Sequence, residues 1–214
     1  MQNPIIYYLY DPLCVWSYGF SSVIQEFYQK HQEEGLEFRV LSVGMYVGEQ
    51  EGRIGEVAEH LGDLYPQVEK MTGVAFGQGF RDKILEPGTA AFSSLPGALA
   101  MAAFRRYQPD NAIPFAVRIQ KAIYDEGRFP VEAKTYGYCA EDFGMNAQDF
   151  MKLMVDKELL EHVKQEFKVV KEWGIKGYPA VIYQPKEQGY LMNQGYAPLN
   201  TLEYAFEKVK QEAD

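Results

Sequence analysis

The sequence predicts an α/β protein in which the strands of one sheet come from the two ends of the chain and a large all-helical insertion lies between them. Runs of β-branched and aromatic residues, which suit buried strands, lie near residues 5–10, 36–43, 179–183 and 190–194. Between about residues 45 and 156 the apolar residues recur instead at the spacing of amphipathic helices. The chain has 214 residues, which is long for one domain and short for two. We therefore expect a single domain over residues 1–214 with a helical insertion over residues 45–156.

The first strand leads through a turn into a helix. Ile5–Tyr10 is an uninterrupted apolar run, and the Asp-Pro pair at residues 11–12 ends it. Apolar residues then follow the helical spacing from Ser17 to about Glu34, and residues 36–43 form the next strand. Because strand, helix and strand follow closely, they form a βαβ unit, so the two strands should be parallel and joined by a right-handed crossover.

Cys14 stands at the mouth of this first helix. Unpaired backbone N–H groups and the positive end of the helix dipole both favour a thiolate there. A lone cysteine can also be a small buried apolar residue with no reactivity. The strand before Cys14, the turn that exposes it and the hydroxyl of Ser17 one helical turn later favour the reactive interpretation. We therefore predict that Cys14 is a nucleophile with a lowered pKa.

The insertion and the C-terminal part have clear periodic signals. Helices are predicted around residues 54–64, 96–107, 115–123 and 150–154, with Asn146 as a cap of the last. A longer helix over residues 157–173 carries the apolar stripe Leu160, Val163, Phe167 and Val170. The strands at residues 179–183 and 190–194 have a short polar connection, which predicts an antiparallel hairpin, and a helix begins near Pro198.

Composition and charge exclude several classes of function. The net charge of −9 repels nucleic acid and anionic lipid, so neither nucleic-acid nor membrane partners are expected. No phosphate-binding glycine loop is present, and the three histidines lack metal-ligand spacing, so we expect no metal and no resident cofactor. The N-terminal residues do not form a signal peptide, and two cysteines are no disulfide framework. The expected location is the reducing cytoplasm.

Two motifs resemble those of the DsbA-like disulfide oxidoreductases, in particular their cytoplasmic branch. They are residues 11–19 (Asp-Pro-Leu-Cys-Val-Trp-Ser-Tyr-Gly) and residues 173–180 (Trp-Gly-Ile-Lys-Gly-Tyr-Pro-Ala). The resemblance extends over almost the whole chain and implies a thioredoxin-like fold with a helical insertion. Kappa-class glutathione transferases and hydroxychromene carboxylate isomerases share this architecture, so the fold hosts more than one chemistry.

The resemblance implies a cis peptide bond between Tyr178 and Pro179, in a loop beside the Cys14 sulfur, with the Tyr178 backbone free to pair with a substrate strand. A trans proline at the start of an edge strand is the alternative from the residues alone. Trp16, Tyr178 and Pro179 are the candidate substrate-binding residues, and packing roles are the alternative for Trp16 and Tyr178. Cys139 lies within the helical insertion, where a buried core cysteine is expected.

The sequence departs from the family pattern at Ser17, where the oxidoreductases carry a second cysteine. Serine cannot resolve a mixed disulfide, although its hydroxyl can donate a hydrogen bond to the Cys14 thiolate. The leading hypothesis is therefore a monothiol (Cys-x-x-Ser) oxidoreductase or isomerase that acts on protein or low-molecular-weight disulfides, with glutathione as a candidate co-substrate. A glutathione-dependent transferase or isomerase and a non-catalytic interaction module are the alternatives.

Overall fold

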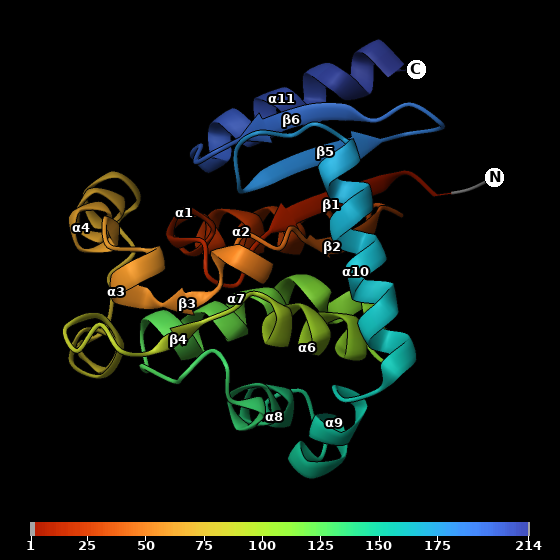
Figure 1. Cartoon of the computed structure of the whole chain (residues 1–214). Helices are drawn as coiled ribbons and strands as arrows, with labels where there is room; N and C mark the ends of the chain where they lie inside the picture. The colour runs from red at the N-terminus through yellow and green to blue at the C-terminus, as the bar shows by residue number, and fades with distance from the viewer. Residues whose placement is uncertain (1–2, 214) are drawn as a thin grey trace.

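The computed structural model describes residues 3–213, and its centre is a four-stranded sheet with the strand order β2-β1-β5-β6 (Figure 1). The strands are β1 (Ile5–Tyr10), β2 (Glu37–Ser42), β5 (Ala180–Gln184) and β6 (Tyr190–Gln194). Strands β1 and β2 are parallel, while β5 is antiparallel to both β1 and β6. This arrangement confirms the predicted βαβ unit and the predicted C-terminal hairpin.

Helices cover the sheet on both sides. They are α1 (Val15–Gly19), α2 (Ser21–His31), α10 (Lys157–Glu172) and α11 (Leu199–Ala213). The first predicted helix is thus divided at Phe20, which ends α1 and precedes α2. Gly19 lies at this division, where a Cβ would stand 2.7 Å from the Val68 side chain. The small residue lets α1 pack closely on α4 (Leu61–Thr72).

The insertion lies below the sheet in Figure 1 and packs along its β2 edge. Helix α6 contacts α10, and α7 contacts both α2 and β2, so the insertion and the sheet share one core. Asn146 caps α9 as predicted, because its side chain accepts a hydrogen bond from the Asp149 N–H at 3.1 Å. The main helices of this region are α6 (Leu95–Arg105), α7 (Ala112–Tyr124), α8 (Ala133–Glu141) and α9 (Ala147–Leu153).

The prediction that the insertion is wholly helical is wrong in one respect. Two short strands, β3 (Gly52–Arg53) and β4 (Ala91–Phe92), pair with each other in an antiparallel ribbon. They do not join the central sheet. A two-residue strand is too short to leave an alternating pattern in the sequence. The remaining elements of this region are η1 (Gly48–Gln50), α3 (Ile54–Val57), α5 (Gln78–Phe80), η2 (Arg81–Leu85) and η3 (Pro109–Asn111).

A buried ion pair ties the insertion to α10 and to the sheet edge. The Arg105 guanidinium on α6 pairs with the Glu166 carboxylate on α10 and also donates to the Val40 carbonyl on β2. The other Glu166 oxygen accepts a hydrogen bond from the Ser42 N–H at 2.8 Å. Glu166 therefore lies on the buried face of α10, which we predicted to be wholly apolar. The buried residues of α10 are Leu159, Val163, Glu166 and Val170. The predicted stripe is therefore wrong at Leu160, whereas Phe167 is partly buried and packs against the core as predicted.

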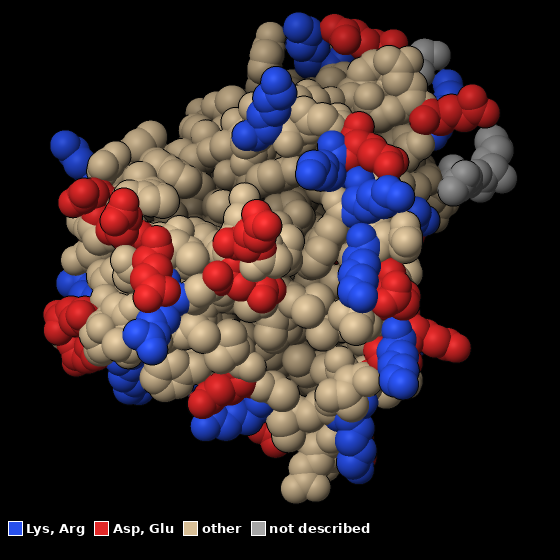
Figure 2. Space-filling model, in the orientation of Figure 1, with Lys and Arg blue, Asp and Glu red and all other residues tan. Residues whose placement is uncertain are grey.

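The surface charge is unevenly distributed. Figure 2 shows Lys and Arg side chains in a row along the side of the molecule where α10 runs, and Asp and Glu side chains near the centre and left of the same view. The exposed lysines of α10 include Lys164, Lys168 and Lys171. Within residues 3–213, no helix is long and apolar enough to cross a membrane.

Candidate active site

Cys14 lies where β1 ends and α1 begins. The turn before it is closed by hydrogen bonds from the Cys14 N–H to the Asp11 carbonyl at 3.1 Å and from the Leu13 N–H to the Asp11 Oδ1 at 2.9 Å. Cys14 has extended backbone angles at the N-cap of α1, and its carbonyl accepts the first helical hydrogen bond from Tyr18. Its exposed fraction is 5%, so the sulfur is almost covered in this state.

The Tyr178–Pro179 loop lies against the Cys14 sulfur. The peptide bond between these two residues is cis. The sulfur is 3.8 Å from the Tyr178 carbonyl oxygen, a distance at which a thiol is a weak donor. The carbonyl that we expected to be free for a substrate strand therefore faces the thiol. The Tyr178 hydroxyl points back along its own loop and donates to the Ile175 carbonyl at 3.2 Å.

Ser17 is fully buried one helical turn after Cys14. Its hydroxyl makes no hydrogen bond of good geometry to any described residue. The Ser17 hydroxyl is close enough to the Cys14 thiol and the Tyr8 hydroxyl to lower the pKa of both groups. The side chain is thus closed off from solvent next to the thiol.

The Cys14 pKa is raised, and the prediction of a lowered value is wrong for this state. Burial is the largest cause, since it disfavours the charged thiolate, and the nearby Asp11 carboxylate acts in the same direction. The Ser17 hydroxyl and the N–H groups of Ser17 and Trp16 lower the pKa, but they do not outweigh burial. The helix start can be recognised in the sequence, but the extent of burial cannot. The prediction therefore included the N–H groups that lower the Cys14 pKa and left out the burial that raises it.

Asp11 is a buried carboxyl group beneath the site. Its two oxygens accept hydrogen bonds from the Leu13 N–H, the Met45 N–H and the Ser94 hydroxyl, at 2.8 to 2.9 Å. Burial nevertheless raises the Asp11 pKa to about 6, against the effect of these donors. Sequence reasoning treated Asp11 only as the residue that ends β1. Its hydrogen bonds also join the loops that follow β1 and β2 to the start of α6.

Two aromatic residues, Trp16 and Tyr46, lie near Cys14. Trp16 is partly buried and packs against the main core. Tyr46, in the loop after β2, is held by a hydrogen bond from its N–H to the Ser94 hydroxyl at 2.9 Å and by an edge-to-face contact with Phe92. Its pKa is raised to about 12 by burial and then by the charges of Asp11 and Cys14, so its ring lies near both. No local pattern in the sequence could have identified Tyr46.

Cys139 lies in the helical insertion and forms no disulfide with Cys14. Both cysteines are free thiols in this structure. Cys139 lies on α8, which packs on α6, α7 and α9, and burial raises its pKa to about 12. Its sulfur is 3.9 Å from the Arg118 carbonyl. Within the described part of the chain, no group of three or more His, Cys, Asp or Glu side chains could hold a metal ion.

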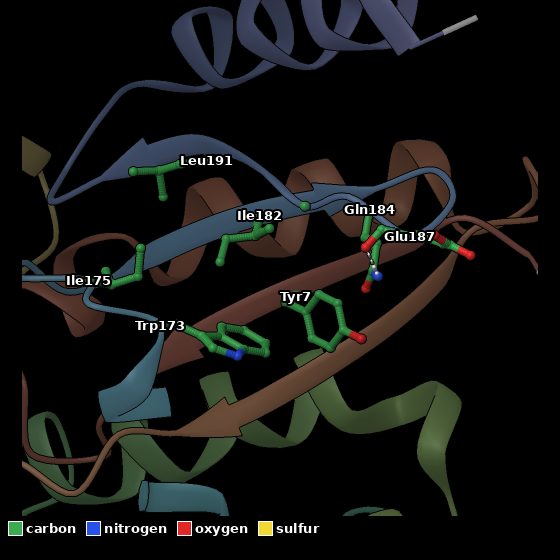
Figure 3. Close-up of a pocket in the computed structure, with 8 residues that line it drawn as sticks. Tyr7, Trp173, Ile175, Ile182, Gln184, Glu187 and Leu191 are labelled. Atoms are coloured by element: carbon green, nitrogen blue, oxygen red, sulfur yellow. Dashed lines mark hydrogen bonds between the residues drawn. The ribbon is translucent and has the colours of Figure 1, made fainter. Parts of the chain in front are cut away.

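A hollow of about 380 Å³ lies elsewhere, on the sheet surface beside the end of α10 (Figure 3). The Tyr7 ring and the Trp173 indole form one wall, with their ring centres 5.3 Å apart. Neither Cys14 nor Pro179 lines it. The lining residues are Tyr7, Trp173, Ile175, Ile182, Gln184, Glu187, Gly189 and Leu191.

No protein-family model and no curated protein matches this chain. Solved structures do match it over nearly their full length. A candidate protein disulfide isomerase from Nitrosomonas europaea has 22% identity and a TM-score of 0.87, with 100% of both chains covered. The cytosolic disulfide reductase DsbM from Pseudomonas aeruginosa has 22% identity and a TM-score of 0.79, with 97% of this chain and 99% of that chain covered. A 2-hydroxychromene-2-carboxylate isomerase has 13% identity and a TM-score of 0.62, with 98% and 97% covered.

These likenesses establish the fold. The chain has the α/β fold of the DsbA-like thioredoxin-fold proteins, with a helical insertion between β2 and α10, as its motifs indicated.

Proposed function

We propose that this protein, which has the DsbA-like thioredoxin fold, is a monothiol thiol–disulfide oxidoreductase with Cys14 as its nucleophile. One observation carries the proposal: the Cys14 sulfur lies at the start of α1 against the Tyr178 carbonyl that precedes the cis-proline, with a serine and not a cysteine one turn later. This arrangement supplies a group that can attack a disulfide. It supplies no second thiol beside the first.

The proposed reaction consists of two thiol–disulfide exchange steps. The Cys14 thiolate attacks one sulfur of a disulfide, a new S–S bond to Cys14 forms, and the other sulfur leaves as a thiolate that takes up a proton. An outside thiolate, for which we propose glutathione, then attacks the sulfur of the bound partner or of Cys14. Where the bound partner is glutathione, this second attack releases glutathione disulfide and restores Cys14. Overall, one protein–glutathione mixed disulfide and one free glutathione give one protein thiol and one glutathione disulfide.

The raised pKa of Cys14 favours reduction over oxidation as the working direction. A thiolate that burial destabilises is a poor leaving group, so a disulfide bond to Cys14 is broken reluctantly. A strong oxidant requires the opposite, a stabilised thiolate. The solved DsbM structure with glutathione fits a thiol co-substrate on this fold. We accordingly propose a reducing, cytoplasmic setting with protein or small disulfides as substrates.

Trp16, Tyr178 and Pro179 are the proposed substrate contacts. Substrate must displace the weak thiol contact of the Tyr178 carbonyl before this carbonyl can pair with a substrate strand. Trp16 is partly exposed beside Cys14 and offers an apolar surface to the arriving chain.

A glutathione transferase or isomerase is less well supported. In such an enzyme Ser17 would hold the thiolate of a bound glutathione, but its side chain is fully buried and interacts with the Cys14 thiol. In this position Ser17 can serve Cys14 and not an incoming thiol. A non-catalytic module would keep Cys14 as an inert core residue, and such a residue would form no adduct with glutathione disulfide.

The test is a mass-spectrometric search for adducts after incubation with glutathione disulfide, together with an insulin-reduction assay driven by glutathione. We expect one glutathione adduct at Cys14 in the wild type and in Cys139→Ala, and none in Cys14→Ala. Adduct formation should rise with pH, because the thiolate fraction rises. Insulin reduction should be slow and should depend on Cys14. A wild type that takes no adduct would exclude the oxidoreductase and leave the interaction module.

A further inference from the structure

Three buried hydroxyl groups behind the candidate site lack hydrogen-bond partners among the described residues. They belong to Tyr8, Tyr10 and Ser17, and each of these side chains has an exposed fraction of 0%. Buried polar groups without partners cost free energy, so a cluster of them requires an explanation. Tyr8 and Tyr10 are two residues apart on β1 and their rings stack with centres 5.5 Å apart, so they project from the same face of the sheet.

The two tyrosines differ in their neighbours. Tyr8 lies next to α1: its ring contacts Phe20 at 6.2 Å between centres, and its hydroxyl is near Ser17 and Cys14. After burial, the groups that shift the Tyr10 pKa most are Tyr8, Asp11, Tyr136 and Arg105, and neither Ser17 nor Cys14 is among these main causes. The chain thus offers two buried tyrosines of the same type, on one strand and one face, of which only the first is beside the sulfur.

We propose that Tyr8 is a positioning residue for Cys14: its hydroxyl donates to the Ser17 oxygen when the Ser17 hydroxyl donates to the Cys14 thiolate. This proposal rests on the proposed function and adds a residue to it. The reason is geometric. A serine hydroxyl has one proton, and turning it to the sulfur leaves its oxygen lone pairs in a buried space where they need a donor.

Tyr8 is suited to this role because it keeps its proton. Burial, and then the nearby Cys14 charge, raise the Tyr8 pKa far above the ordinary tyrosine value, so its hydroxyl keeps the proton that it would donate. In the resting thiol state, neither hydroxyl needs to point at the sulfur. The chain Tyr8, Ser17 and Cys14 would form only with the thiolate, and hydrogen bonds in such a chain strengthen one another in a buried setting.

The test measures the ionisation of Cys14 by the pH dependence of its thiolate absorbance, in a Cys139→Ala background and corrected by the Cys14→Ala protein. It needs no substrate and no turnover. We expect Tyr8→Phe to move the midpoint upward and to lower the thiolate population at a given pH roughly threefold to tenfold, which is the effect of about one hydrogen bond. Tyr10→Phe removes the same atom from the neighbouring residue and should leave the midpoint unchanged.

A double-mutant comparison tests whether Tyr8 acts through Ser17. Ser17→Ala should raise the midpoint, and Tyr8→Phe should have no further effect in the Ser17→Ala protein. Equal midpoints for Tyr8→Phe and wild type, equal shifts for Tyr8→Phe and Tyr10→Phe, or additive shifts of Tyr8→Phe and Ser17→Ala would each overturn the proposal. Since adduct formation is measured separately, a protein that fails to react with disulfides but shows the expected midpoints would refute the proposed function and not this inference.

Discussion

At the scale of the residue, Asp11 is the group whose charge matters most for the site. Its carboxyl group is fully buried, and its three hydrogen-bond donors come from the turn before Cys14, the loop after β2 and the start of α6. The same carboxylate raises the pKa of Cys14. Asp11 therefore fixes the position of the nucleophile and at the same time disfavours its thiolate.

We expect the stability of the wild type to depend on pH through Asp11. The folded pKa of about 6 lies above the value of about 3.9 for an unfolded aspartate. The folded state therefore holds the proton more tightly, and the stabilisation is fully present below about pH 4 and is lost as the pH rises through about 6. The difference corresponds to about 3 kcal/mol.

Urea unfolding of wild type and Asp11→Asn between pH 4 and pH 7.5 measures this effect. The free energy of unfolding of wild type relative to Asp11→Asn should fall by about 2 kcal/mol over this range, because asparagine does not titrate. Parallel profiles for the two proteins would show that Asp11 does not ionise as described.

At the scale of the element, the Arg105–Glu166 pair holds three elements together. It joins α6 of the insertion, α10 and the β2 edge, and both side chains are largely buried. Removing one partner leaves the other charge buried and uncompensated, which is more costly than replacing both.

We expect Glu166→Gln to lower the free energy of unfolding by about 3 kcal/mol. The control is Glu161→Gln on the same helix, whose partner Lys164 and own side chain are both more than half exposed. That change should have an effect of less than about 1 kcal/mol. In denaturant unfolding, Glu166→Gln should lower the free energy of unfolding less in an Arg105→Met background than in the wild type. Equal losses in both backgrounds would show that Glu166 is not stabilised by its ion pair with Arg105.

Most of the longer helices and strands could be predicted from the sequence. Long apolar runs and helical spacing identified the central strands and most helices, because burial of one face imposes a period on the residues. The ribbon of β3 and β4 left no pattern, since two residues cannot show a period. Helix α8 was also missed as a separate element.

The site was predicted less completely than the fold. The motifs brought Cys14, Ser17 and the Tyr178–Pro179 loop together, and the structure places the sulfur and the loop in contact. Tyr46 reaches the site only through the packing of distant elements, and Tyr8 through the packing of α1 on the strand that precedes it. No local pattern records either contact. The pKa of Cys14 had the wrong sign for the same reason, because its main cause is burial by the rest of the molecule.

At the scale of the whole molecule, the fold buries Cys14 at a position where it can form a mixed disulfide. The protein places no second thiol beside it that could resolve this disulfide. The only other cysteine, Cys139, lies on α8 in the insertion with a strongly raised pKa. A mixed disulfide at Cys14 should therefore persist until an outside thiol arrives. A resolving thiol at position 17 would act intramolecularly, at an effective concentration on the order of 10⁵ M for well-oriented groups.

The most direct measurement is the lifetime of the glutathione adduct at Cys14, followed by mass spectrometry after excess glutathione disulfide is removed. In the wild type the adduct should persist without added thiol and should disappear when glutathione is supplied. In Ser17→Cys it should disappear unaided, with formation of a disulfide between residues 14 and 17, and insulin reduction should be faster than in the wild type. An adduct that decays as fast in the wild type as in Ser17→Cys, or that gives a disulfide between Cys14 and Cys139, would contradict the monothiol account.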